Sequence, residues 1–134
     1  MPLTFTRRLK RGNARNWPGV IVMDPEAPLP AAVWAQECYE AEHKLNPVNL
    51  FRVALSKGAR RNMEIMGHEI EVQAAACVYS KDEAAYRADE ARALTKYSEF
   101  KGWSREKITA SMEGRSEAAV RWVKRNIRQI KARA

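Results

Sequence analysis

The pattern of apolar and polar positions changes about thirty residues into the chain. Residues 3–9 alternate loosely between apolar and polar side chains, and residues 20–23 (Val-Ile-Val-Met) are all apolar, which predicts two short strands. Turn-forming residues lie at Gly12-Asn13 and again over residues 16–19, and three prolines fall within residues 24–30. We therefore expect a short N-terminal β-hairpin followed by an irregular segment.

From residue 31 onward the pattern is helical. Pro47 and Gly58 separate the first three predicted helices, Ser80-Lys-Asp-Glu83 has the form of a capping box, and Ser104 is placed to cap a later helix. The predicted helices cover residues 31–45, 48–56, 59–79, about 80–100, 104–114 and 116–132. The expected fold class is mainly α (α+β), with a short β-hairpin followed by about five to six helices.

The length of 134 residues and the 46% apolar content predict a single domain over residues 1–134. We expect residues 1–30 to form a basic arm with short strands, residues 31–79 to hold the candidate site, and residues 80–134 to form C-terminal helices. No run approaches the roughly 18 apolar residues of a membrane helix, and the N-terminus lacks the apolar stretch of a signal peptide. A soluble protein of the cytoplasm or of a virion, without a membrane partner, is expected.

The cysteines and tryptophans are expected to serve packing. Cys38 and Cys77 lie on different predicted helices, and both are expected to be reduced core thiols. Without a Cys-x-x-Cys spacing the chain has no zinc-ribbon site. Core or packing positions are also expected for the four tryptophans: Trp17, Trp34, Trp103 and Trp122.

Residues 19–76 contain the pattern that suggests a chemistry. An apolar run at Gly19–Met23 precedes a helix with the sequence Gln36-Glu37-Cys38-Tyr39-Glu40, and a second helix about 25 residues later contains Glu69-Ile70-Glu71-Val72-Gln73. This order resembles the core of the small zincin metallopeptidases, in which a His-Glu-x-x-His helix follows an edge strand and a later helix donates a glutamate to zinc. Gln36 and Glu40 stand where that motif has its histidines, and Glu37 stands where it has its general base.

The resemblance implies a zincin-like core with a vestigial site made of Gln36, Glu37, Glu40 and Glu69. Zincins bind zinc through two imidazoles one helical turn apart, so a chain without them is expected to have neither bound zinc nor peptidase activity. Glu69 lies on an apolar helical stripe, where a carboxylate must be paired or bound. We expect it to face Glu37 and Glu40 across the helix crossing; the alternative is a pair with an arginine.

Two further interpretations of this region stay open. Glu40 and His43 have the Glu-x-x-His spacing of carboxylate metal sites, so Glu40, His43 and Glu69 could bind zinc or manganese in a metal-dependent hydrolase with Glu37 as base. His68 shares a polar stripe with Glu64 and Glu71, and we expect it at the surface, paired with one of them.

Charge separates the two ends of the chain from its middle. Residues 1–23 contain five basic and no acidic residues, residues 24–100 have a net charge of −4, and residues 101–134 have a net charge of +7. Positive ends indicate contact with a nucleic acid or an acidic protein surface. The contacting residues are expected to be Arg7, Arg8, Lys10, Arg11, Arg15, Arg121, Lys124, Arg125 and Arg128.

The leading functional hypothesis is a non-catalytic, zincin-like protein that binds through these basic surfaces. The resemblance implies an origin in a bacteriophage or mobile element and a role as a virion or assembly component. A metal-dependent hydrolase with unusual ligands is one alternative, and a purely structural helical protein is another.

Overall fold

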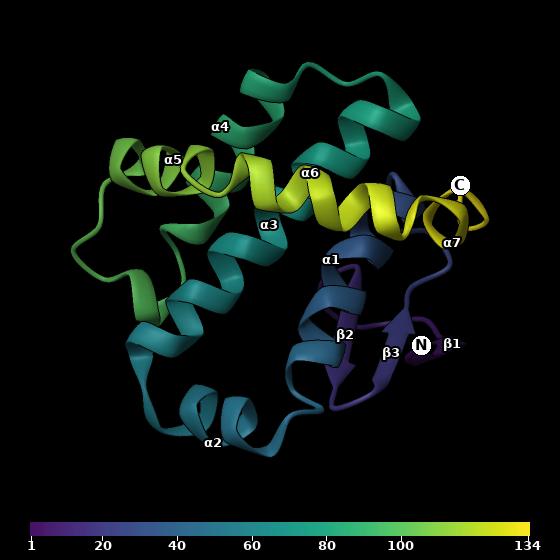
Figure 1. The fold of residues 1–134 in the computed structure, drawn as a ribbon, viewed down its shortest axis with the longest axis horizontal. Coiled ribbons are helices and arrows are strands. Elements are labelled where there is room, and N and C mark those ends of the chain that lie inside the picture. The colour runs from purple at the N-terminus through teal and green to yellow at the C-terminus, as the bar shows by residue number, and fades with distance from the viewer.

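Three short strands form a sheet at the N-terminal end of the chain, and every later element is a helix (Figure 1). The computed structural model describes residues 1–134. Strand β3 (Val20–Met23) lies between β1 (Leu3–Thr6), to which it is parallel, and β2 (Ala14–Trp17), to which it is antiparallel. The hairpin is therefore β2–β3, closed by a tight turn in which Gly19 has a φ of 72°. The mainly helical α+β class is confirmed.

Seven α-helices follow the sheet, and most of them begin close to the predicted residues. Their bounds are α1 (Pro30–His43), α2 (Pro47–Leu55), α3 (Lys57–Tyr79), α4 (Glu83–Leu94), α5 (Arg105–Glu113), α6 (Ser116–Arg125) and α7 (Ile127–Lys131), with a 3₁₀ turn η1 (Ser98–Phe100) after α4. Asp82, and not Ser80, caps α4 by accepting from the backbone of Ala85. The last predicted helix is divided at Asn126, whose φ of −112° leaves the helical range.

The core lies on both sides of α3, the longest helix of the chain (Figure 1). The larger apolar cluster joins β3, α1, α3, α6 and α7, with Trp34 and Ile70 fully or almost fully buried in it. A smaller cluster packs α3 against α4, α5 and η1 around Phe100. Helix α1 follows α3 closely, so side chains of these two helices meet along most of the length of α1.

The two ends of the chain are both attached to α1 through Trp34. Its indole N–H donates to Oγ1 of Thr4 in β1 at 3.0 Å, and the guanidinium of Arg133 lies 5.1 Å from the ring centroid. Both termini are accordingly on the same side of the molecule in Figure 1. Helix α1 therefore anchors both ends of the chain through one side chain.

The packing roles predicted for tryptophan and cysteine are met only in part. Trp34, Trp122 and Cys38 are buried and Trp103 is half-buried, whereas Trp17 is exposed, and so is Cys77. No disulfide links the two cysteines, which are both free. The expectation of a core position was wrong for Cys77, and Trp17, expected at a core or packing position, lies outside the core and is half exposed.

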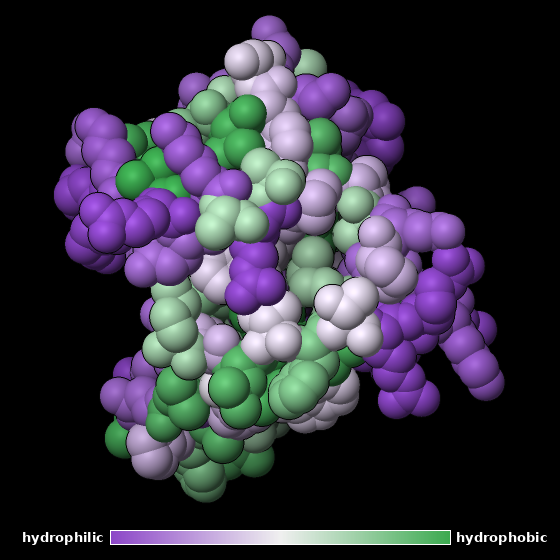
Figure 2. Space-filling model, turned by 90° about the vertical axis from the view of Figure 1, so that its right-hand side faces the viewer, coloured by the Kyte–Doolittle hydropathy of each residue, from purple (hydrophilic) through white to green (hydrophobic).

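Helix α2 presents an apolar face to solvent. Its side chains Val48, Phe51 and Leu55 are more than half exposed, and only Val53 is buried. In Figure 2 apolar atoms gather toward the lower end of the molecule, the end at which α2 lies, and hydrophilic side chains project on both flanks. None of the helices has the length and apolar character required to cross a membrane.

Candidate functional site

Helices α1 and α3 come into direct contact at Gly67. A Cβ atom at this position would lie 2.8 Å from Oε2 of Glu40 and 3.3 Å from Cγ of Gln36. Glycine inside a helix costs about 1 kcal/mol relative to alanine. Here it leaves room for two polar side chains of α1 to rest on the backbone of α3.

The polar side chains of α1 at this crossing are buried and mutually oriented. Gln36, Glu37 and Glu40 are 8%, 8% and 3% exposed. The amide nitrogen of Gln36 donates to Oε2 of Glu40 at 2.8 Å. Asn16 of β2 donates to both Glu37 and Glu40, and its own Oδ1 accepts from Nζ of Lys44 at 2.7 Å. Strand β2 therefore helps to fix the two carboxyl groups of α1.

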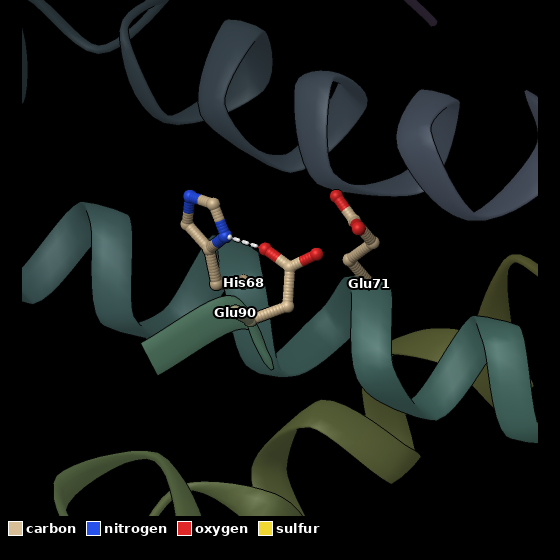
Figure 3. A group of neighbouring side chains, drawn as sticks. All are labelled: His68, Glu71 and Glu90. Atoms are coloured by element: carbon tan, nitrogen blue, oxygen red, sulfur yellow. Dashed lines mark hydrogen bonds and ion pairs between the residues drawn. The ribbon is translucent and has the colours of Figure 1, made fainter. Parts of the chain in front are cut away.

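His68 is the residue of α3 that meets these side chains. It is 5% exposed, and its Nε2 lies 3.2 Å from the Gln36 amide nitrogen and 3.3 Å from Oε2 of Glu64. Its Nδ1 lies 2.5 Å from Oε2 of Glu90, which enters from α4. Figure 3 shows His68 and Glu71 projecting from α3 toward α1, with Glu90 between them. The imidazole thus connects three helices.

These groups form what we name the acid–histidine cluster, which consists of Glu37, Glu40, Glu64, His68, Glu71 and Glu90. Around a single imidazole it gathers five carboxyl groups, supported by the neutral donors of Asn16, Gln36 and Tyr86, whose hydroxyl donates to Glu71 at 2.6 Å. Such a collection of buried acids is costly unless protons or cations neutralise it.

The environment of the cluster favours the protonated form of three of its carboxyl groups. Burial, followed by the charges of Glu64 and Glu37, raises the pKa of Glu40 well above its ordinary value. Burial and the neighbouring Glu90 raise the pKa of Glu71 in the same way, and burial also raises the pKa of Glu37. These three carboxyl groups therefore bind protons more readily than free glutamate does.

One ion pair remains in the middle of the cluster. Burial by itself would lower the pKa of His68, but hydrogen bonds to Glu64 and Glu90 outweigh it and raise that pKa well above the ordinary value. Burial would raise the pKa of Glu90, but hydrogen bonds with His68 and Glu71, together with the charge of His68, outweigh it and lower that pKa. The charged forms of His68 and Glu90 are therefore favoured as a pair, next to carboxyl groups whose pKa values are raised.

Three members of the cluster are arranged as metal ligands could be. One ligand atom from each of His68, Glu71 and Glu90 can be chosen so that all lie within 4.8 Å of one another. One imidazole nitrogen with carboxylate oxygens suits zinc, manganese and non-haem iron. This arrangement could therefore bind a divalent cation and exchange protons with groups beside it.

The expected approach of Glu69 to Glu37 and Glu40 was wrong. Both oxygens of Glu69 are held by Arg87 of α4, at 2.8 and 2.7 Å, and Gln73 donates to it at 2.9 Å. Successive helix residues point about 100° apart, so the side chain of α3 that reaches α1 is His68, one residue earlier. The alternative expectation, a pair between Glu69 and an arginine, is confirmed.

The other sequence expectations for this region are met in part. His68 pairs with Glu64 as expected, but it is buried and not at the surface. His43 stacks on Tyr39, with ring centroids 5.8 Å apart, and lines a groove on α1. The alternative ligand set of Glu40, His43 and Glu69 is therefore not brought together. Glu90 was missed, because only the packing of α4 on α3 brings it to His68.

The basic residues expected to contact a polyanion all lie at the surface. Among the nine, only Arg8 forms an ion pair, with Glu26 at 2.6 Å. Four of them line one groove beside the exposed ring of Trp17: Arg7, Arg8, Lys10 and Arg15. On the C-terminal helices, Arg121, Lys124, Arg125 and Arg128 are exposed on α6 and α7.

No family model matches the chain, and comparisons with curated proteins and with solved structures likewise found no match. The function is therefore argued from the geometry of the chain itself.

Proposed function

We propose that the protein binds a divalent metal ion at the acid–histidine cluster, with His68, Glu71 and Glu90 as ligands. The observation that carries this proposal is the gathering of five carboxyl groups, three of them buried and two partly buried, around one buried imidazole between three helices. A divalent cation would let these groups ionise without mutual repulsion.

The mixed nitrogen and oxygen donors favour Zn²⁺ or Mn²⁺ over Ca²⁺, which prefers oxygen alone. A metal ion of this kind acidifies a bound water and so supplies a nucleophile for hydrolysis. Glu37 and Glu40, oriented by Asn16 and Gln36, would accept the proton as general bases. The proposed activity is accordingly that of a metal-dependent hydrolase.

A zincin-like origin stays part of this proposal, supported by the contact of Gln36 with His68.

Calorimetric titration of Zn²⁺ and Mn²⁺ into chelator-treated protein tests the metal site. We expect stoichiometric binding by the wild type and a loss of about 10- to 100-fold or more in affinity for His68→Gln and Glu71→Gln. His43→Gln is the matched control, since it removes an imidazole that lies outside the cluster, and it should keep the wild-type affinity. Absence of binding by the wild type, or equal losses in all three variants, would overturn the proposal.

A second function is favoured by the groove beside Trp17. Four cations and a half-exposed indole share this groove, and cations interleaved with an aromatic ring are typical of surfaces that bind single-stranded nucleic acid. We propose that the basic arm contacts a nucleic acid, or an acidic protein, as a virion or assembly component would. Contacts of this kind are mainly to phosphates, so they depend steeply on salt and little on sequence.

Fluorescence anisotropy with a labelled single-stranded oligonucleotide, measured over a range of salt, tests this second function. Arg7→Gln with Arg15→Gln should lower the salt slope by about 1 for each phosphate that the variant no longer neutralises. Trp17→Ala should weaken binding and leave the slope unchanged, since it removes stacking and no charge. Arg92→Gln on α4 is the control for net charge. No binding at about 50 mM salt would exclude nucleic acid as the partner.

A further inference from the structure

A second groove, of about 360 Å³, opens where α1, α2 and α3 meet the start of α6. Its polar lining contains no carboxylate and consists of His43, Asn49, Arg52, Asn62 and Arg115. The remaining wall is largely apolar, with Tyr39 from α1 and with Met63 and Met66 from α3. A volume of this size lies within the range of small-molecule sites.

Arg115 is the residue that gives this groove a chemical preference. Its Nη2 donates to Oδ1 of Asn62 at 3.0 Å, which fixes the plane of the guanidinium. Its Nε is buried and has no hydrogen-bond acceptor, alone among the buried side-chain nitrogen and oxygen atoms of the protein. A guanidinium that lines a groove without an acidic partner favours an anionic ligand there.

The second cation of the groove is equally free of acidic partners. Arg52 of α2 forms no ion pair, nor does Arg115, and no acidic side chain lines the groove between them. Two guanidinium groups and the amides of Asn49 and Asn62 present more donors than a carboxylate can use. A phosphate group carries three free oxygens and nearly two negative charges, and it matches this set of donors.

We propose that the groove binds a small phosphomonoester, with its phosphate between Arg52 and Arg115 and its organic part against Tyr39, Met63 and Met66. None of these residues belongs to the acid–histidine cluster or to the nine basic residues of the polyanion surfaces. The site therefore goes beyond both proposed functions, and it does not depend on a metal ion. His43, which lies one helical turn after Glu40 on α1, places the groove next to the cluster.

Calorimetric titration in the presence of a chelator tests this site separately from metal binding. The probes are phenyl phosphate, inorganic phosphate and benzoate, which separate the contribution of the phosphate from that of the organic part. We expect phenyl phosphate to bind most tightly and benzoate most weakly, because benzoate has fewer oxygens and a smaller charge. Tighter binding of benzoate than of phenyl phosphate would overturn the assignment to phosphate.

Variants locate the binding within the molecule. Arg52→Gln and Arg115→Lys should each weaken phenyl phosphate about tenfold or more, since the lysine keeps the charge but loses the planar fork of donors. Arg92→Gln, which removes an exposed charge on α4, should change the affinity less than about twofold. Far-UV circular dichroism verifies that each variant folds. Because Arg52 is exposed on α2, Arg52→Gln should fold and still tests the site if Arg115→Lys does not. Unchanged affinity in both groove variants, or an equal loss in Arg92→Gln, would overturn the proposal.

Discussion

Nδ1 of His68 lies 2.5 Å from Oε2 of Glu90, and this contact joins the middle of α3 to α4 inside a group of carboxyls. Both side chains are largely buried, with 7% and 18% of their surfaces exposed. The pair is surrounded by Glu37, Glu40 and Glu71, whose pKa values are all raised. The protonation state of this small region therefore couples to the stability of the entire helical core.

The metal-free protein should lose stability as the pH rises from about 5 to about 8. The pKa values of Glu40 and Glu71 lie well above 4.5 in the folded state, so above pH 4.5 the folded protein holds protons that the unfolded chain releases. His68 acts in the same direction: its raised pKa contributes stability that is complete below pH 6.5 and is lost as the pH passes the folded value. Urea unfolding at several pH values, with a chelator present, measures this slope.

Glu40→Gln should make that slope shallower and raise the free energy of unfolding at pH 8 by about 1 kcal/mol or more, since glutamine keeps the shape without the charge. Glu113→Gln, at an exposed position of α5, should change neither quantity. A wild-type stability that rises over this pH range would contradict the raised pKa values.

Much of the helical framework could be predicted from the sequence, because proline, glycine and capping residues act locally. Ser104 accepts from the backbone of Lys107 as a capping residue should, and α2 begins at Pro47, one residue before its predicted start. Strand β2 could not be predicted in this way. Its sequence, Ala-Arg-Asn-Trp, lacks an apolar pattern, and it is a strand because β3 pairs with it.

The site shows the same division between local and long-range signals. The spacing of Glu64, His68 and Glu71 indicates a polar stripe on α3, and the sequence alone suggests that these residues interact. Their burial depends on α1 and α4, which lie far away in the sequence, and no local pattern specifies that contact. The bidentate pair of Glu69 with Arg87 is a long-range contact of the same kind.

Arg87→Met should destabilise the protein strongly. Glu69 is fully buried, and without Arg87 its carboxylate would have only Gln73 as a donor. Removal of one partner from a buried ion pair costs about 3–5 kcal/mol, which urea unfolding would detect. Adding Glu69→Leu to Arg87→Met should restore most of that stability, because neither charge is then left buried.

Glu83→Gln is the control for this pair. Glu83 also contacts Arg87, at 2.7 Å, but 48% of its side-chain surface is exposed, so its replacement should cost less than about 1 kcal/mol. If the double variant is no more stable than Arg87→Met, then the Glu69–Arg87 pair contributes more to stability than the neutralisation of its two charges.

Gly67→Ala tests the close contact of α1 with α3. Helix propensity alone would stabilise the protein by about 1 kcal/mol. We expect no such increase, because the new Cβ would lie 2.8 Å from Oε2 of Glu40 and would displace its carboxyl group from Gln36. Gly58→Ala, in the first turn of the same helix, is the control, since its added Cβ would come no closer than 3.6 Å to a neighbouring atom. An equal increase in the free energy of unfolding for both variants would contradict a tight crossing.

The two thiols should differ sharply in reactivity. Cys77 is exposed, whereas Cys38 is buried, and burial together with the neighbouring Glu42 raises the pKa of its thiol far above the ordinary value. Because the thiolate is the reactive form, Ellman's reagent should modify Cys77 rapidly and Cys38 only after unfolding. Cys77→Ser should therefore abolish the fast phase in the native protein and leave one thiol that reacts in denaturant. A fast phase that persists in Cys77→Ser would show that α1 opens at Cys38, and the packing of α1 in the core would then be less stable than its burial indicates.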